Sequence, residues 1–181
     1  MVDLIAVTPG AGILPLSVGG LELTEAVTGP MASLAPFKGR MDAVAAALQA
    51  AFGIGFPGPN QSLNSGDVRL VWAGIGRALL IGAPVPEGVG ALAAVVDQAD
   101  GMAVVRVAGP RVEAVLARLV PVDLRLRAFA EGATARTMLG HMTVTLTRIA
   151  PEVIEVMAMR SMAATLVHEI AEAARGGAAR G

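Results

Sequence analysis

The apolar stretches of this chain are interrupted at short intervals, although the mean hydropathy is high, at +0.64. A helix that spans a membrane needs about 20 consecutive apolar residues. The apolar segment 70–85 is broken by Arg77 and by four glycines or prolines, and segment 91–107 is broken by Asp97 and Asp100. These interruptions predict short strands and helices without a membrane span. The excess apolar surface must therefore be buried in a core or against another protein.

The chain has 181 residues, of which 54% are apolar and 16% are charged. This composition is typical of a folded globular protein, and the length suits one hydrophobic core. We therefore expect a single compact domain over residues 1–181, or two intimately packed halves. Residues 1–20 form a Gly/Pro-rich N-terminal segment, and we expect residues 175–181 to be a frayed tail.

The charges are balanced, with 14 basic and 15 acidic residues and a formal net charge of -1. Nucleic acid is an unsuitable partner because its binding needs clustered basic residues, and Lys38 is the only lysine. The chain has no cysteine, which excludes disulfides, thiolate nucleophiles and zinc-thiolate sites. The start of the sequence lacks a basic leader, so we expect a cytoplasmic protein that does not contact a membrane.

Four segments have apolar spacing or capping residues that predict helices. Asp42 is expected to cap a helix over 43–52 that ends at Gly53. Gly109-Pro110 opens a second helix, whose buried stripe is Val112, Val115, Leu116 and Leu119. The remaining two helices are predicted over 89–99 and from a Ser161 cap to about Ala174.

Strands are predicted from period-two alternation and from paired runs around turns. Apolar Met142, Val144 and Leu146 alternate with threonines, which indicates a half-buried strand over 142–149. Loops with one or two short strands are expected over 1–40, and a loop is expected over 53–66. Further strands are predicted over 68–72, 78–82, 102–107, 133–139 and 153–159. The mixed order favours an α+β fold with mainly antiparallel sheets and packed helices.

Few residues carry a chemical signature. The G-x-G fragments do not continue to a dinucleotide motif, so each is interpreted as a turn. We interpret Asp97 and Asp100 as turn residues. We expect Glu152 and Glu155 to be solvated. The only tryptophan, Trp72, is expected in the core. Three arginines lie in or beside predicted strands, where each guanidinium needs a carboxylate or carbonyl partner. For all three we favour structural pairing over ligand binding; they are Arg136, Arg148 and Arg160.

The motifs of the second half, taken in order, resemble the gamma subunit of heterotetrameric sarcosine oxidase. The first-half segments 52–57 and 72–74 are also similar to that family, and the resemblance covers roughly residues 20–172. The second-half motifs are the segments 105–116, 121–129, 135–141 and 159–163.

That family is similar to the folate-binding domain of the glycine-cleavage aminomethyltransferases. The resemblance implies two interlocked ferredoxin-like halves. The acidic pair that assists one-carbon chemistry in the transferases falls, by spacing, on Gly140 and His141 here, and their Asn falls near Arg160. The carboxylate that the transfer needs is therefore missing from these positions.

The resemblance implies a non-catalytic subunit of a complex that demethylates sarcosine oxidatively and transfers the one-carbon unit to tetrahydrofolate. No cofactor is expected in this chain, and NAD, FAD, FMN and tetrahydrofolate would belong to partner subunits. The expected partners are the larger alpha and beta subunits and the delta subunit. The alternative is an independent folate-binding one-carbon transfer protein of the aminomethyltransferase type. We expect four residues to lie on an interface or ligand surface: Arg136, His141, Arg160 and Ser161.

Overall fold

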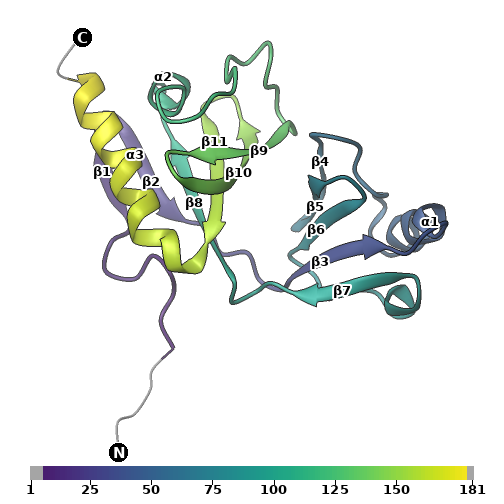
Figure 1. The fold of residues 1–181 in the computed structure, drawn as a ribbon. Coiled ribbons are helices and arrows are strands. Elements are labelled where there is room, and N and C mark those ends of the chain that lie inside the picture. Colours follow the sequence, from purple (N-terminus) through teal and green to yellow (C-terminus); the bar gives the residue numbers. More distant parts are fainter. Residues whose placement is uncertain (1–5, 179–181) are drawn as a thin grey trace, which may run out of the picture.

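A computed structural model describes residues 6–178 of the chain. Two antiparallel sheets pack face to face, and helices cover their outer faces (Figure 1). The helix α3 lies on one side of the molecule and α1 on the other, so the layers run helix, sheet, sheet, helix. The α+β class with mainly antiparallel sheets is confirmed.

Sheet A has six strands in the order β1-β2-β8-β11-β10-β9, and every neighbouring pair is antiparallel. It combines two strands from the N-terminal part of the chain with four from the C-terminal part. The strands are β1 (Leu16–Val18), β2 (Leu21–Glu25), β8 (Met102–Ala108), β9 (Thr134–Leu139), β10 (Met142–Ala150) and β11 (Val153–Met159).

Sheet B has five strands in the order β4-β5-β6-β3-β7, again with antiparallel neighbours. The predicted hairpin around Gly74 and Gly76 is formed by β5 and β6. The strands are β3 (Met31–Pro36), β4 (Ser62–Ser65), β5 (Val68–Gly74), β6 (Arg77–Ile81) and β7 (Ala93–Asp97).

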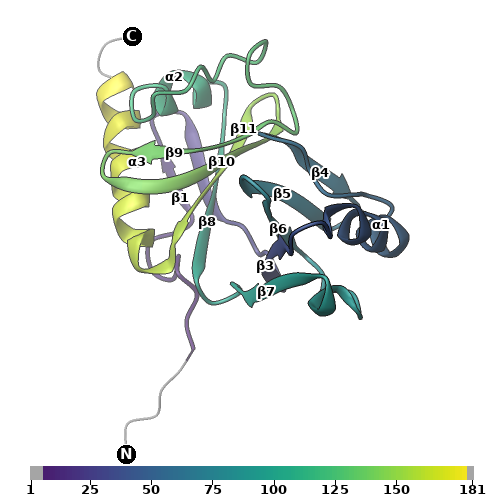
Figure 2. The ribbon, with the colours of Figure 1, turned by 45° about the vertical axis from the view of Figure 1, so that its right-hand side comes forward.

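Each sheet contains a βαββαβ unit of the ferredoxin-like type. In sheet B the unit is β3-α1-β5-β6-η1-β7, and β4 adds an edge strand beside β5. In sheet A the corresponding unit is β8-α2-β10-β11-α3, with β9 as the added edge strand, and β2 supplies the last strand from the N-terminal side. All of sheet B is thus inserted between the paired strands β2 and β8, which confirms two interlocked ferredoxin-like halves (Figure 2).

The helices are α1 (Met41–Phe52), α2 (Val112–Leu116) and α3 (Ala163–Ala178), with two 3-10 turns, η1 (Val89–Ala91) and η2 (Arg160–Met162). Gly53 ends α1 in the left-handed conformation, as predicted, with φ 74°. Asp42 lies inside the first turn and Arg40 is the N-cap, so the predicted Asp42 cap is wrong. No helix in residues 6–178 is both long and apolar enough to traverse a bilayer.

The final helix differs from its prediction at both ends. Ser161 lies within η2, whereas α3 begins at Ala163, so Ser161 does not directly precede the helix as predicted. The helix extends to Ala178, beyond the predicted end at about Ala174, and residues 179–181 lie outside the described part, so the frayed tail stays a prediction. The Arg175 guanidinium contacts the Glu172 carboxylate one turn earlier, an arrangement that supports an exposed helix end.

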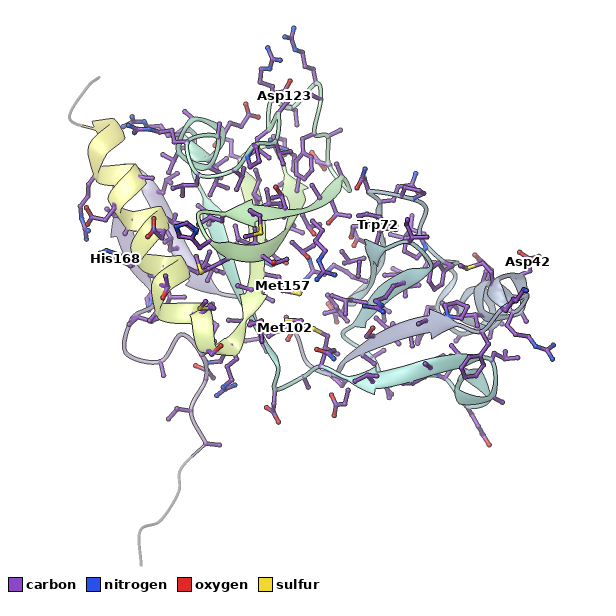
Figure 3. The ribbon with its side chains drawn as sticks, viewed as in Figure 1. Asp42, Trp72, Met102, Asp123, Met157 and His168 are labelled. Atoms are coloured by element: carbon purple, nitrogen blue, oxygen red, sulfur yellow. The ribbon has the colours of Figure 1, made fainter. Side chains whose placement is uncertain are left out.

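Buried side chains form three apolar clusters that follow the layers. The largest lies between sheet A and its helices and includes Val112, Val115 and Leu116, so the predicted stripe of α2 is confirmed there. A second cluster joins the two sheets, where Figure 3 shows Met157 and Met102 between them. The third lies between sheet B and α1, around Leu48.

Four other sequence predictions need correction. The segment 89–99, predicted as a helix, forms η1 and the strand β7, which pairs with β3. The loop predicted over 53–66 contains β4, and the N-terminal 40 residues contain three strands instead of one or two. Trp72 is half-buried, since it lies in β5 against a surface hollow rather than in a core cluster.

Candidate functional site

A buried carboxylate joins the two sheets. The side chain of Glu155 on β11 is only 4% exposed. Its Oε2 accepts a hydrogen bond of 2.6 Å from Arg69 Nη1 on β5 of sheet B. Its Oε1 accepts bonds of 2.8 Å and 3.2 Å from Arg106 on the neighbouring strand β8. Charge-assisted bonds of this kind are among the strongest polar contacts in proteins, so the triad fixes how one sheet lies on the other.

A cleft of about 460 Å³ opens beside this triad, lined also by Asn64, Asp67 and the β2–β3 connection. A general base needs a carboxylate oxygen that is free to take a proton from a substrate. Both oxygens of Glu155 are instead engaged by guanidinium groups. The arrangement therefore serves to hold the sheets together and offers no free acid–base group at Glu155.

The expectation that Glu155 is solvated is wrong. Its strand presents alternate residues to sheet B, and Glu155 lies on that face with Met157. One sequence signal could have indicated that Glu155 is buried. Two apolar segments each contain a single charged residue, Arg106 in β8 and Glu155 in β11. Only the strand register, which places these two residues opposite each other, shows that they pair.

Arg148 on β10 is completely buried, and each of its three guanidinium nitrogens donates a hydrogen bond within the chain. Its Nε donates to the Phe129 carbonyl at 2.5 Å, and its Nη2 donates to Glu113 Oε1 at 3.0 Å. The other bonds go to the carbonyls of Leu124 and Pro151. The structural pairing predicted for Arg148 is therefore confirmed. Arg148 ties the long connection after α2 to the sheet.

Arg136 lies on β9, which faces the edge of sheet B. Its Nη1 donates to the Ala73 carbonyl of β5 at 3.1 Å. A backbone bridge between Gln61 and Ala133 joins the same two regions. The carbonyl that this guanidinium needs is therefore supplied by the chain itself, and Arg136 remains exposed around that contact.

Arg160 and Ser161 lie at the start of η2, where the described part of the N-terminal segment passes. Arg160 Nη2 donates to the Val7 carbonyl. A shallow hollow beside them is lined by Val7, Thr8, Pro9 and Met159, of which Met159 is 63% exposed. The structure thus places the described part of the Gly/Pro-rich segment against the Arg160 region.

His141 is exposed in the two-residue turn between β9 and β10, after Gly140 with φ 55°. No hydrogen bond joins it to Arg136, Arg160 or Ser161 within residues 6–178. The four residues thus lie at three places, and a single surface formed by all of them stays a prediction. His168 is exposed on α3 (Figure 3). In the described part of the chain, no three His, Asp or Glu side chains converge as metal ligands do.

In the connection after α2, an exposed ion pair between Asp123 and Arg125 shifts the pKa of the aspartate. Asp123 accepts hydrogen bonds from both the side chain and the backbone N–H of Arg125. These bonds lower the pKa of Asp123 to about 2, since they favour the charged carboxylate. Figure 3 shows Asp123 at the outer tip of the molecule.

Comparison with known proteins gives a match only at the level of structure. No family model matches the sequence, and no curated protein matches it. A solved structure does match, with a TM-score of 0.77 and 24% sequence identity. It is a chain of heterotetrameric sarcosine oxidase from Corynebacterium sp. U-96, in complex with pyrrole 2-carboxylate. The two chains share one fold.

The match covers 93% of this chain and 94% of the other, so the two chains are nearly equal in length. The resemblance that the sequence motifs predicted is confirmed for the fold.

Proposed function

We propose that this chain is the gamma-type subunit of a heterotetrameric sarcosine oxidase and has no active site of its own. The match to a sarcosine oxidase chain of nearly equal length carries the proposal. The ordered motifs of the second half support it independently, since they resemble the gamma subunit and not a large flavin-binding chain. In this role the chain helps to assemble a complex that demethylates sarcosine and transfers the one-carbon unit to tetrahydrofolate.

The polar residues of the two sheets are consistent with a structural role. Glu155 and Arg148 are buried and engaged by partners in the same chain. The proposal assigns NAD, FAD, FMN and tetrahydrofolate to the partner subunits, which are the alpha, beta and delta chains in the cytoplasm. The contact region for a large subunit includes Arg160, Ser161 and the N-terminal segment, with Arg136 and His141 at further contacts.

The first test is co-expression of the tagged chain with the candidate partner subunits from the same genome. We expect a stable complex that has a flavin absorption spectrum and oxidises sarcosine. The chain purified alone should be colourless and inactive with sarcosine. If the co-expressed chain purifies without the candidate partners, or if the chain alone carries a yellow chromophore or oxidises sarcosine, the proposal is contradicted.

The second test separates an assembly surface from a folate site. Arg160→Ala and Arg136→Ala should weaken co-purification with the large subunits, whereas Arg127→Ala at an exposed loop position is the matched control and should not. Tetrahydrofolate binding to the isolated wild-type chain, measured by calorimetry, should be undetectable. If folate binds, and the two arginine variants lose it while assembly is intact, the aminomethyltransferase-type alternative replaces the proposal.

A further inference from the structure

The strand β7 is an edge of sheet B, and beyond the buried Ala93 its residues are exposed on both faces. It pairs with β3 on one side, and no described strand lies beyond it on the other. Val95 and Val96 point to opposite faces, and they are 38% and 53% exposed. Two adjacent exposed valines leave apolar surface above and below the same edge.

The hydrogen-bonding groups of β7 alternate between β3 and the open side. The bonds from Phe37 N–H to the Leu92 carbonyl and from Gln98 N–H to the Met31 carbonyl set the phase of the pairing. In an antiparallel pair every second residue directs both backbone groups away from its neighbour. Ala93, Val95 and Asp97 therefore present N–H and C=O groups outward.

Proteins usually block an open edge with proline, lysine, a bulge or a covering segment. The strand β7 contains neither proline nor lysine, and its register with β3 is continuous, without a bulge. Its only charge is Asp97 at the last position. The edge is thus able to pair with a further strand.

The other half of the molecule shows how the same position is completed. In sheet A the strand that corresponds to β7 is β2, and the chain's own β1 pairs with its outer edge. The helix α3 covers that sheet, whereas its counterpart in sheet B is the three-residue turn η1. A hollow of about 420 Å³ is left beside β7, lined by apolar residues that include Ala32, Val85 and Val95.

We propose that β7 accepts an extended, mainly apolar segment of a partner subunit as a sixth strand of sheet B. One apolar side chain of that segment enters the hollow beside Val95. This inference rests on the proposed function, because it takes the occupant from the large subunits of the complex. Strand addition of this kind uses main-chain bonds for affinity and side-chain pockets for specificity.

The charges near β7 add a requirement for the segment. Asp97 Oδ1 accepts the Ala99 N–H in a turn, as predicted, and both Asp97 and Asp100 are exposed. Within residues 6–178, neither carboxylate takes part in an ion pair. A lysine or arginine of the added strand near this end would complement them.

The decisive measurement is hydrogen exchange of the backbone amides of 93–97 in the isolated chain and in the assembled complex. We expect the amides of Val95 and Asp97 to exchange slower by about tenfold or more in the complex, because an added strand protects them. If the complex forms and these amides exchange as fast as in the isolated chain, the inference is wrong while the proposed function stands.

Substitution provides a second, independent readout. Val95→Pro removes an outward N–H without removing a bond to β3, and should weaken assembly by about ten- to hundred-fold. Val95→Thr keeps the N–H and is the matched control, with assembly close to wild type. Equal assembly of the folded proline variant would overturn the inference. Protection of the same amides in a homodimer of the chain would also overturn it, since a second copy would then be the occupant.

Discussion

The half around sheet A and the half around sheet B have the same strand order but differ in how completely they are covered. Beside β2, the strand equivalent to β7, sheet A has the 16-residue helix α3 and the additional strand β1, whereas β7 has the three-residue turn η1 and an open edge. Sheet A also holds the largest apolar cluster and the buried Arg148. The same topology can therefore form one half that covers this strand with its own residues and another half that leaves the equivalent strand open to a partner.

The largest expected effect concerns the buried charge that only the sheet A half contains. Arg148→Ala leaves Glu113 and three carbonyls without their donor. Because each buried acceptor left unpaired costs about 1–3 kcal/mol, the variant should lose about 3–5 kcal/mol. Urea unfolding should show this loss. Arg148→Lys keeps the charge without the donor fork and should recover part of the stability. A loss below about 1 kcal/mol would mean that the half does not depend on this centre.

Matched truncations of the two cores come next. Leu116→Ala on α2 should cost about 2–5 kcal/mol by cavity formation, with an unchanged m-value. Leu48→Ala on α1 removes the same atoms from the less covered half, where neighbours can close the cavity more easily, and should cost less. If Leu48→Ala costs as much stability as Leu116→Ala, or more, the less complete cover of sheet B does not make its core easier to truncate.

The link between the halves is tested at Glu155. Glu155→Gln keeps the shape but removes the charge that holds Arg69 and Arg106, with an expected loss of about 1–3 kcal/mol. Because the triad joins sheet B to sheet A, we also expect a lower m-value, as unfolding becomes less cooperative. Glu152→Gln, at an exposed turn, is the control. An unchanged m-value together with an unchanged midpoint would show that the apolar contact between the sheets suffices.

The smallest effect is a pH dependence confined to the sheet A half. The pKa of Asp123 is lowered from 3.8 to about 2 in the folded chain. Its contribution to stability is therefore present above pH 4 and is lost as the pH falls toward 2. Both side chains are exposed, so the contribution is small. Asp123→Asn should reduce the slope of stability against pH between 4 and 2, and an unchanged slope would contradict the assignment.

Local patterns were sufficient for most of sheet A. The alternation of Met142, Val144 and Leu146 predicted β10, and a strand of this pattern buries one face whatever it packs against. Segment 89–99 failed because apolar residues at Val89, Leu92 and Ala93 have helical spacing. Pairing with β3 made 93–97 a strand instead, whereas Val89 lies in the short turn η1.

The candidate site was less predictable than the fold. That Arg136, Arg148 and Arg160 need acceptors follows from their chemistry alone, and all three have acceptors in the chain. Which acceptors they find depends on segments distant in the sequence, such as Ala73 for Arg136 and Val7 for Arg160. The Glu155 triad was missed because its two arginines come from different sheets.

The sequence by itself determined the α+β class, the strands with clear alternation, the Gly53 helix end and the need to pair strand arginines. Each of these depends on the conformational or hydrogen-bonding preference of residues close together in the chain. The tertiary structure alone decided that sheet B is inserted between β2 and β8, that Glu155 is buried and that β7 is left open. These features depend on which distant strands pair, and burial follows from that pairing and not from any single residue.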